Sequence, residues 1–269
     1  MMCHDLSFTA NTVHFITDIL PGIILDGQLG IDFCTTAHVL SMSNRKCLCI
    51  YNRNGKPHLN EFEWGLVADY MNTPELIKKY RIQMANARKE NILDRKSAWY
   101  KIRNNRCLIA VDGIYEHRNV TGWKNKIPYF IKLKNSNHLF LPGLYNFSPV
   151  PNRETGEMKG TFTIITRPAN ELMMKIHNHG TNKHRMPVFM SPQMALKWIN
   201  EDLTDNDIEQ FLDFEIPSWE LEAWPVYMIR TTNQRPDGKD KREEFAYEKL
   251  PPLGDNSGLQ PLQGAMFEN

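Results

Sequence analysis

Short apolar runs closed by turn residues recur along the chain and predict strands. These runs cover residues 46–51, 106–111, 129–133, 138–141, 161–166 and 223–229. Helices are fewer, and each predicted helix begins with a capping sequence. Thr73 and Ser191 each precede a first-turn proline, and Thr204 with Asp207 resembles a capping box. The pattern predicts a single α+β domain over residues 1–235.

The pattern changes after about Gln234. The chain turns to Arg-Pro-Asp-Gly and then to Pro251-Pro252, with little apolar periodicity between them. We expect residues 236–269 to form a peripheral or disordered C-terminal tail.

Charge is distributed unevenly, although the net charge is only +1 and predicts neither a nucleic-acid-binding nor a membrane-surface protein. Lys78 to Arg106 holds ten Lys or Arg and two acids, whereas Asn200 to Ile229 holds nine acids and no Lys or Arg. The basic stretch is either a solvated helix face or a surface that binds a polyanion.

Five cysteines at no regular spacing indicate reduced thiols rather than a disulfide framework. Cys47-Leu-Cys49 is too short a spacing for paired zinc ligands and predicts alternation in a strand. No segment reaches the roughly 18 apolar residues of a transmembrane helix, and the start of the chain does not resemble a signal peptide. We therefore expect a soluble cytoplasmic protein.

Residues with catalytic potential lie in short separate motifs, without a phosphate loop, a nucleophile elbow or a His-Glu-x-x-His helix. The motifs are Met2-Cys3, Asn86-Ala87-Arg88, Val111-Asp-Gly-Ile-Tyr-Glu116 and Ile176-His177-Asn178, followed by Arg185-Met186-Pro187. If the residues before it are removed, Cys3 offers a thiol and an α-amine on one carbon. This pair can trap an aldehyde as a five-membered ring.

In this order the motifs resemble the SRAP family (SOS response-associated peptidase), whose members covalently shield abasic sites in single-stranded DNA. The matching segments also include Trp64-Gly65-Leu66, Arg106-Cys107-Leu108 and Pro128-Tyr129, and they span residues 2 to about 190. The resemblance implies a β-rich domain with a mixed, partly barrel-like sheet and peripheral helices. It implies a monomer that binds single-stranded DNA, associates with the nucleoid when bound, and needs no cofactor.

The resemblance also implies a role for each candidate catalytic residue. The amine of Cys3 condenses with the abasic-site aldehyde, and its thiolate then closes a thiazolidine. Glu116 shuttles the proton, and His177 assists opening of the sugar ring or stabilises the neighbouring phosphate. Asn86 holds the terminal amine.

Three further residues are implied in DNA binding. Arg88 and Arg185 contact phosphates, because a guanidinium fork binds two oxygens at once. Trp64 either stacks on a base beside the lesion or packs in the core.

The chain departs from the family pattern in three places. Residues 179–184 are an insertion, so His184 competes with His177 for the family's histidine position; we prefer His177 because an aliphatic residue precedes it. The nearby histidines also allow a metal site, which the loop-like sequence and the lack of acidic or cysteine ligands disfavour. Asp5 replaces an arginine often found in the family and should weaken the local phosphate contact. Met1 precedes Met2, and the reaction requires removal of both.

Two other functions remain open. Cys3, His177 and Glu116 could form a cysteine peptidase that cuts the chain's own amino-terminal extension. Alternatively, the domain could bind single strands without a covalent step.

Overall fold

The computed structural model of the chain describes residues 4–8, 11–26, 38–43, 45–199, 202–231 and 235–256. Cys3 therefore lies outside the described residues. The strands are β1 (Asp5–Ser7), β2 (Ile24–Leu25), β3 (Val39–Leu40), β4 (Lys46–Arg53), β5 (Lys56–Trp64), β6 (Asn86–Arg88), β7 (Arg106–Val111), β8 (Gly113–Arg118), β9 (Ile127–Leu133), β10 (Leu139–Phe147), β11 (Gly160–Pro168), β12 (Arg185–Pro187) and β13 (Leu221–Pro225). The helices are α1 (Asn11–Ile19), α2 (Pro74–Tyr80), α3 (Ala98–Lys101), α4 (Glu171–Ile176), α5 (Pro192–Trp198) and α6 (Asp205–Asp213). Short 3-10 turns cover Ser41–Ser43, Arg81–Met84, Lys89–Asn91 and Ser218–Glu220.

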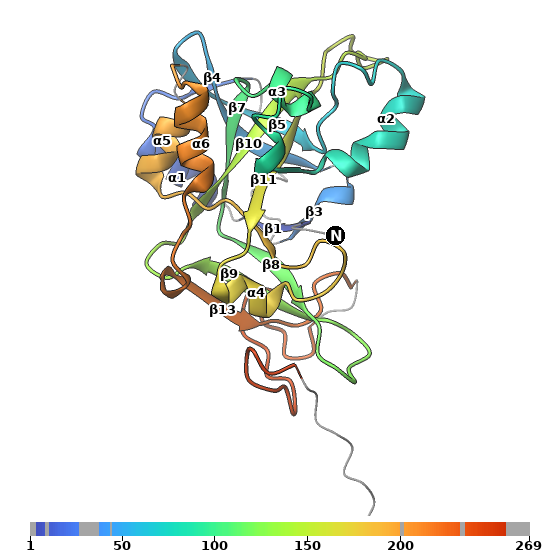
Figure 1. Cartoon of the computed structure of the whole chain (residues 1–269), viewed down its shortest axis with the longest axis vertical. Helices are drawn as coiled ribbons and strands as arrows, with labels where there is room; N and C mark the ends of the chain where they lie inside the picture. Colours follow the sequence, from blue (N-terminus) through green and yellow to red (C-terminus); the bar gives the residue numbers. More distant parts are fainter. Residues whose placement is uncertain are drawn as a thin grey trace, which may run out of the picture.

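The strands form two sheets (Figure 1). The larger sheet has the order β12-β11-β10-β7-β4-β5-β2, and the smaller has the order β13-β9-β8-β1-β3. In the larger sheet β11 also pairs in parallel with β5, at Phe162 and Trp64, so that β5, β4, β7, β10 and β11 close into a ring. The expected α+β fold with a partly barrel-like sheet is confirmed.

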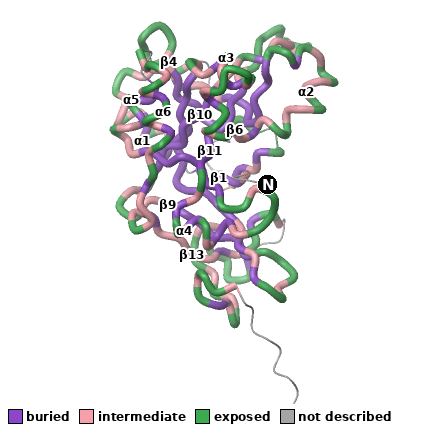
Figure 2. Tube along the Cα trace, in the orientation of Figure 1, coloured by how far each residue is buried: buried purple, intermediate pink, exposed green. Residues whose placement is uncertain are grey.

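The ring is buried on both faces because its central strands alternate between two hydrophobic cores. In β4, Leu48 and Ile50 face the core that helices α1, α5 and α6 cover. Cys47 and Cys49 face the other core, which also takes Leu6 from the smaller sheet. The predicted alternation of these two cysteines in a strand is confirmed. Figure 2 shows the buried trace running through the central strands, with exposed residues at the periphery.

Capping sequences predicted the start of three helices correctly. Thr73, Ser191 and Thr204 cap α2, α5 and α6, and each side-chain oxygen accepts a backbone N–H of the first turn. The capping box of Thr204 and Asp207 is also present. None of the described helices has the length and apolarity needed to cross a bilayer.

The segment 106–116 changes sheet at Asp112, which separates β7 from β8. The Asp112 N–H donates to the Ser7 carbonyl oxygen at 2.9 Å. A Cβ atom on Gly113 would lie 2.5 Å from the Phe130 ring and 2.6 Å from the Ile131 carbonyl oxygen. Only glycine therefore allows the close approach of β8 to β9 that carries Glu116 into the smaller sheet.

The C-terminal segment 235–256 packs against the smaller sheet, through contacts of Arg118 and Tyr247. The guanidinium of Arg118, whose side chain is fully buried, donates to the carbonyl oxygens of Pro251, Pro252 and Asp255. The Tyr247 hydroxyl donates to the Val226 carbonyl oxygen at 2.9 Å. Such specific backbone contacts were not visible in the sequence pattern. The rest of the predicted tail, from residue 257, lies outside the described residues.

Candidate functional site

Glu116 lies next to the amino-terminal strand. β1 pairs antiparallel with β8, with Asp5 opposite Tyr115, and the same register continued by one residue places His4 opposite Glu116. On its other side Glu116 pairs with Tyr129 of β9. Its side chain is only 5% exposed. β8 therefore holds a buried carboxyl group beside the strand that follows Cys3.

His177 is fixed at the end of α4, and its ring orientation indicates which nitrogen is basic. Its backbone N–H donates to Met173 at 2.7 Å, and its Nδ1 atom lies 2.9 Å from the Arg185 carbonyl oxygen. The Arg185 N–H also lies 3.4 Å from Nδ1, and the shorter contact with the carbonyl oxygen favours a proton on Nδ1, which would make Nε2 the basic atom of a neutral ring. The ring is buried, with 3% of the residue exposed. These contacts hold the His177 ring in one orientation.

The elements that carry Glu116 and His177 are joined directly. The side chain of Asn178 accepts from the Asn119 N–H at 2.8 Å and donates to the Asn119 carbonyl oxygen at 2.9 Å. Asn119 follows β8, and Asn178 follows His177. Helix α4 also packs against β8 (Figure 1). These contacts join β8, which carries Glu116, to the segment that carries His177.

Asn86 is the first residue of the short strand β6. β6 runs parallel to β11, with Asn86 opposite Ile164 and Arg88 opposite Thr166. Three residues provide too short an apolar pattern to predict such a strand. The parallel pairing with β11 fixes the backbone at Asn86.

Trp64 packs in the core, which favours a role in core packing over stacking on a base. Its residue is 1% exposed, its ring stacks on Phe162, and its Nε1–H donates to the Ala85 carbonyl oxygen at 2.8 Å. Stacking on a base would require the ring to leave this site. Because Ala85 precedes Asn86, Trp64 instead supports the start of β6.

The two predicted phosphate-binding arginines differ in their surroundings. Arg88 is exposed and donates to the Asn182 side chain at 2.7 Å. Arg185 is buried, and its guanidinium forms two hydrogen bonds with Glu90, at 2.8 and 2.9 Å, and one with the Thr166 carbonyl oxygen. Arg88 is accessible to a phosphate, whereas Arg185 would have to exchange the Glu90 carboxylate for one.

His184, the alternative to His177, is exposed and adopts a left-handed backbone conformation with φ 61°. It lines a surface hollow together with Asn256 and Lys175. The described residues contain no cluster of three or more His, Cys, Asp or Glu suited to a metal ion.

A cluster that the sequence did not reveal surrounds Asp5. Its buried carboxylate accepts from His38 Nε2 at 2.7 Å and from Arg230 Nε at 3.0 Å. Burial opposes ionisation of Asp5, but the hydrogen bonds from His38 and Arg230 outweigh it and lower its pKa. The negative charge that we expected at Asp5 is therefore paired, and Arg230 brings a cation to this position.

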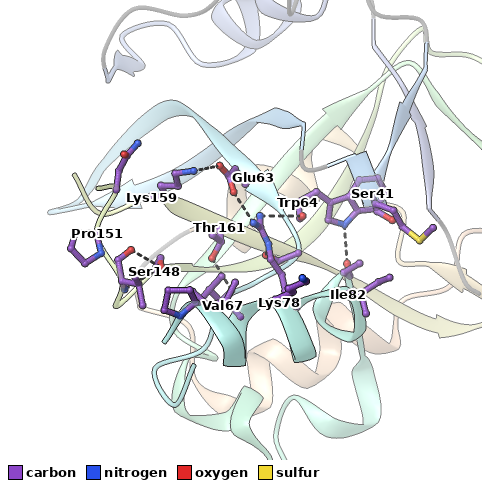
Figure 3. Close-up of a pocket in the computed structure, with 18 of the residues that line it drawn as sticks. Ser41, Glu63, Trp64, Val67, Lys78, Ile82, Ser148, Pro151, Lys159 and Thr161 are labelled. Atoms are coloured by element: carbon purple, nitrogen blue, oxygen red, sulfur yellow. Dashed lines mark hydrogen bonds and ion pairs between the residues drawn. The ribbon is translucent and has the colours of Figure 1, made fainter. Parts of the chain in front are cut away.

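A groove of about 760 Å³ opens between Ser41, Lys78 and Lys159 (Figure 3). Ser41 lies at its wall, and the Ser41 N–H donates to the His4 carbonyl oxygen at 2.8 Å. The other lining residues include the cations Lys78, Arg81, Arg153 and Lys159, the acids Glu63 and Glu154, and the apolar side chains of Met42, Ile77, Ile82 and Val150. The groove therefore has a lining residue, Ser41, that is hydrogen-bonded to His4, and it carries more positive than negative charge.

Glu63 organises two of these cations. Its carboxylate pairs with Arg81 at 2.8 Å and with Lys159 at 3.0 Å. Burial alone would raise the pKa of Glu63, but the hydrogen bond from Lys159 and the charge of Arg81 lower it overall. Glu63 therefore holds both cations at the groove.

The basic stretch 78–106 is only partly free to bind a polyanion. Lys89 pairs with Asp213 and Arg103 pairs with Asp205, both of which belong to α6. The acidic stretch of the sequence thus neutralises part of the basic one. Of the groove cations, Lys78 and Arg81 come from this stretch, and Arg81 pairs with Glu63 rather than with α6.

Comparison with known proteins assigns the chain to a family. The sequence profile of the SRAP family, described as SOS response associated peptidase, matches residues 30–229. The chain belongs to this family. It is 33% identical over 183 residues to the abasic site processing protein YoqW of Bacillus subtilis. The aligned segment covers 68% of this chain and 75% of that protein. It is 25% identical over 165 residues to the abasic site processing protein HMCES of Pongo abelii, which covers 51% of this chain and 44% of that protein.

Solved structures share the fold. A protein from Bacteroides thetaiotaomicron superposes with a TM-score of 0.71 and 25% identity, over 90% of this chain and 97% of that chain. A protein from Bordetella bronchiseptica superposes with a TM-score of 0.66 and 17% identity, over 84% of this chain and 100% of that chain.

Proposed function

We propose that this chain recognises abasic sites in single-stranded DNA, as part of the DNA damage response, and captures them covalently through Cys3. The observation that carries the proposal is the junction of the amino-terminal strand, Glu116 and His177. Two residues span at most about 7 Å, so Cys3 stays within that distance of Asp5. The names of the relatives support the same substrate, because YoqW and HMCES are both abasic site processing proteins.

The proposed chemistry needs only the groups of this chain. The α-amine of Cys3 attacks the aldehyde carbon of the opened sugar, and the aldehyde oxygen leaves as water to give an imine. The Cys3 sulfur then adds to the imine carbon, and its proton passes to the nitrogen, which closes the thiazolidine. The net reaction joins protein and DNA with loss of one water molecule.

Glu116 and His177 move the protons of this sequence. Glu116 transfers protons between the amine and the departing hydroxyl group, since its carboxyl group lies beside the strand that follows Cys3. His177 uses Nε2 to accept the proton of the anomeric hydroxyl when the sugar ring opens, because its Nδ1–H is bound to Arg185. Asn86 holds the terminal amine through its amide oxygen.

The groove beside Ser41 is the proposed path of the strand next to the lesion. Its cations fit phosphates, and its apolar side chains fit the faces of unpaired bases and sugars. Arg88 adds an accessible cation on the strand β6. In a duplex the faces of the bases are stacked on one another, so an apolar groove of this kind favours a single strand.

Denaturing electrophoresis tests the proposal. Protein that begins at Cys3 is incubated with a single-stranded oligonucleotide that contains one abasic site, and with the same oligonucleotide without the lesion. We expect a denaturation-resistant adduct with the abasic strand alone, lost in Cys3→Ala and slowed in Glu116→Gln. Salt-sensitive binding without an adduct would favour a non-covalent binder, and release of an amino-terminal extension by a Cys3- and Glu116-dependent route would favour the peptidase.

A further inference from the structure

Arg230 lies at the centre of the charge cluster beside the amino-terminal strand. Its Nε and Nη2 atoms both donate to the Asp5 carboxylate, which is the side-on arrangement of a bidentate pair. Asp5 is also held by His38, so the carboxylate that orients the guanidinium is itself fixed. The guanidinium of Arg230 is thus held in place beside Asp5, which follows Cys3 by two residues in the sequence.

In this ion pair the Asp5 carboxylate is buried and the Arg230 side chain is partly exposed. The Asp5 side chain is 2% exposed, whereas the Arg230 side chain is 39% exposed. The hydrogen bonds that Arg230 donates to Asp5 raise the pKa of Arg230 against the effect of burial, and the nearby charge of Glu116 adds to this increase. The guanidinium therefore remains charged and presents a solvent-facing edge close to the proposed acid–base residue.

Of the two arginines predicted to bind phosphate, only Arg88 is accessible, because Arg185 is bound to Glu90. A strand captured at Cys3 carries a phosphate on each side of the lesion, and Asp5 alone would repel both. A fixed cation that covers Asp5 removes this repulsion and offers two-point binding of phosphate oxygens at low entropic cost.

We propose that Arg230 binds a phosphate adjacent to the captured abasic sugar, with Asp5 as the residue that positions its guanidinium. This inference rests on the proposed function, because the phosphate is that of the captured strand.

Arg230→Gln tests the inference, and Arg242→Gln is the matched control. Arg242 also pairs with a buried acid, Asp112, and is similarly exposed at 31%, but it lines another hollow with Trp224 and Lys132. Binding of abasic and intact single strands is measured by fluorescence anisotropy from low to high salt, with Cys3→Ala proteins so that no adduct forms. We expect Arg230→Gln to weaken binding to both strands and to reduce the slope of log affinity against log salt by about one, with no change for Arg242→Gln.

A second variant and a kinetic measurement separate phosphate binding from folding. Arg230→Lys keeps the charge and should restore the salt slope even if it restores less affinity. In proteins that begin at Cys3, Arg230→Gln should raise the DNA concentration for half-maximal adduct formation and leave the saturated rate unchanged. An unchanged salt slope in a folded Arg230→Gln protein would overturn the inference. If the wild-type protein formed no adduct at all, the proposed function would fail first.

Discussion

His177 and Arg185 are joined through the histidine ring, whose Nδ1 atom lies 2.9 Å from the Arg185 carbonyl oxygen. The contact fixes the orientation of the ring, in which the proposed function assigns Nε2 as the base. Residues 179–184 form the insertion between these two partners, yet β12 returns Arg185 to the ring. The insertion therefore does not separate His177 from the strand that orients it.

Replacing His177 tests its role in proton transfer. His177→Gln keeps a polar side chain but has no basic nitrogen, so we expect adduct formation to slow by about 100-fold or more with little change in DNA affinity. Single-turnover kinetics measure the rate. His184→Gln is the control on the same loop, and a larger loss in that variant would move the catalytic role to His184.

Trp64→Phe distinguishes a core residue from a base-stacking residue. The substitution removes the hydrogen bond to Ala85, and we expect it to lower the free energy of unfolding by about 1–2 kcal/mol. It should also slow adduct formation, because Ala85 precedes Asn86. Urea denaturation and binding assays measure the two effects. A large loss of single-strand affinity without a loss of stability would show instead that Trp64 contacts a base.

Arg118 holds the C-terminal segment on the smaller sheet. Arg118→Met leaves several carbonyl oxygens without their donor, and each buried unsatisfied acceptor costs about 1–3 kcal/mol. We expect the free energy of unfolding to fall by at least about 2 kcal/mol. Deleting residues 247–269 removes the same contacts, so the two changes combined should cost less than their sum. Full additivity would contradict this coupling.

Two histidines near Asp5 predict a loss of stability in mild acid. Burial lowers the pKa of His4 and of His117 from 6.5 to about 4. Because the folded protein binds these protons less readily than the unfolded chain, their contribution is complete above pH 6.5 and is lost as the pH falls toward 4. Urea denaturation at several pH values should show this decline. His117→Gln should make it shallower, and an unchanged slope would exclude His117 as a cause.

Local features of the fold were predictable from the sequence, and contacts between distant segments were not. The caps at Thr73, Ser191 and Thr204 act within one helical turn, so their sequence signals are complete. By contrast, β6 is defined by its parallel partner β11, and the ring closes through a pairing of Phe162 with Trp64. The short sequence of β6 does not show that it pairs with β11, and the sequence of β5 does not show that it closes the ring with β11.

In the candidate site, too, the sequence indicated single residues but not the contacts between distant segments. The family resemblance indicated Asn86, Glu116 and His177, and the structure places Glu116 and His177 on joined elements. The family resemblance did not indicate Arg230, which is 225 residues from Asp5 in the sequence. Asp5 was expected to be an unfavourable charge, because a sequence shows an acid without the cation that the fold brings to it.

Intact-mass spectrometry of the adduct tests the central claim most directly. Protein that begins at Cys3 is mixed with an abasic single strand without a reducing agent, next to a sample that retains Met1 and Met2. We predict a species whose mass is the sum of protein and DNA less one water, formed only when the Cys3 amine is free and absent in Cys3→Ser. An equally stable adduct from the extended protein, or no adduct from the protein with a free Cys3 amine, would contradict capture as a thiazolidine.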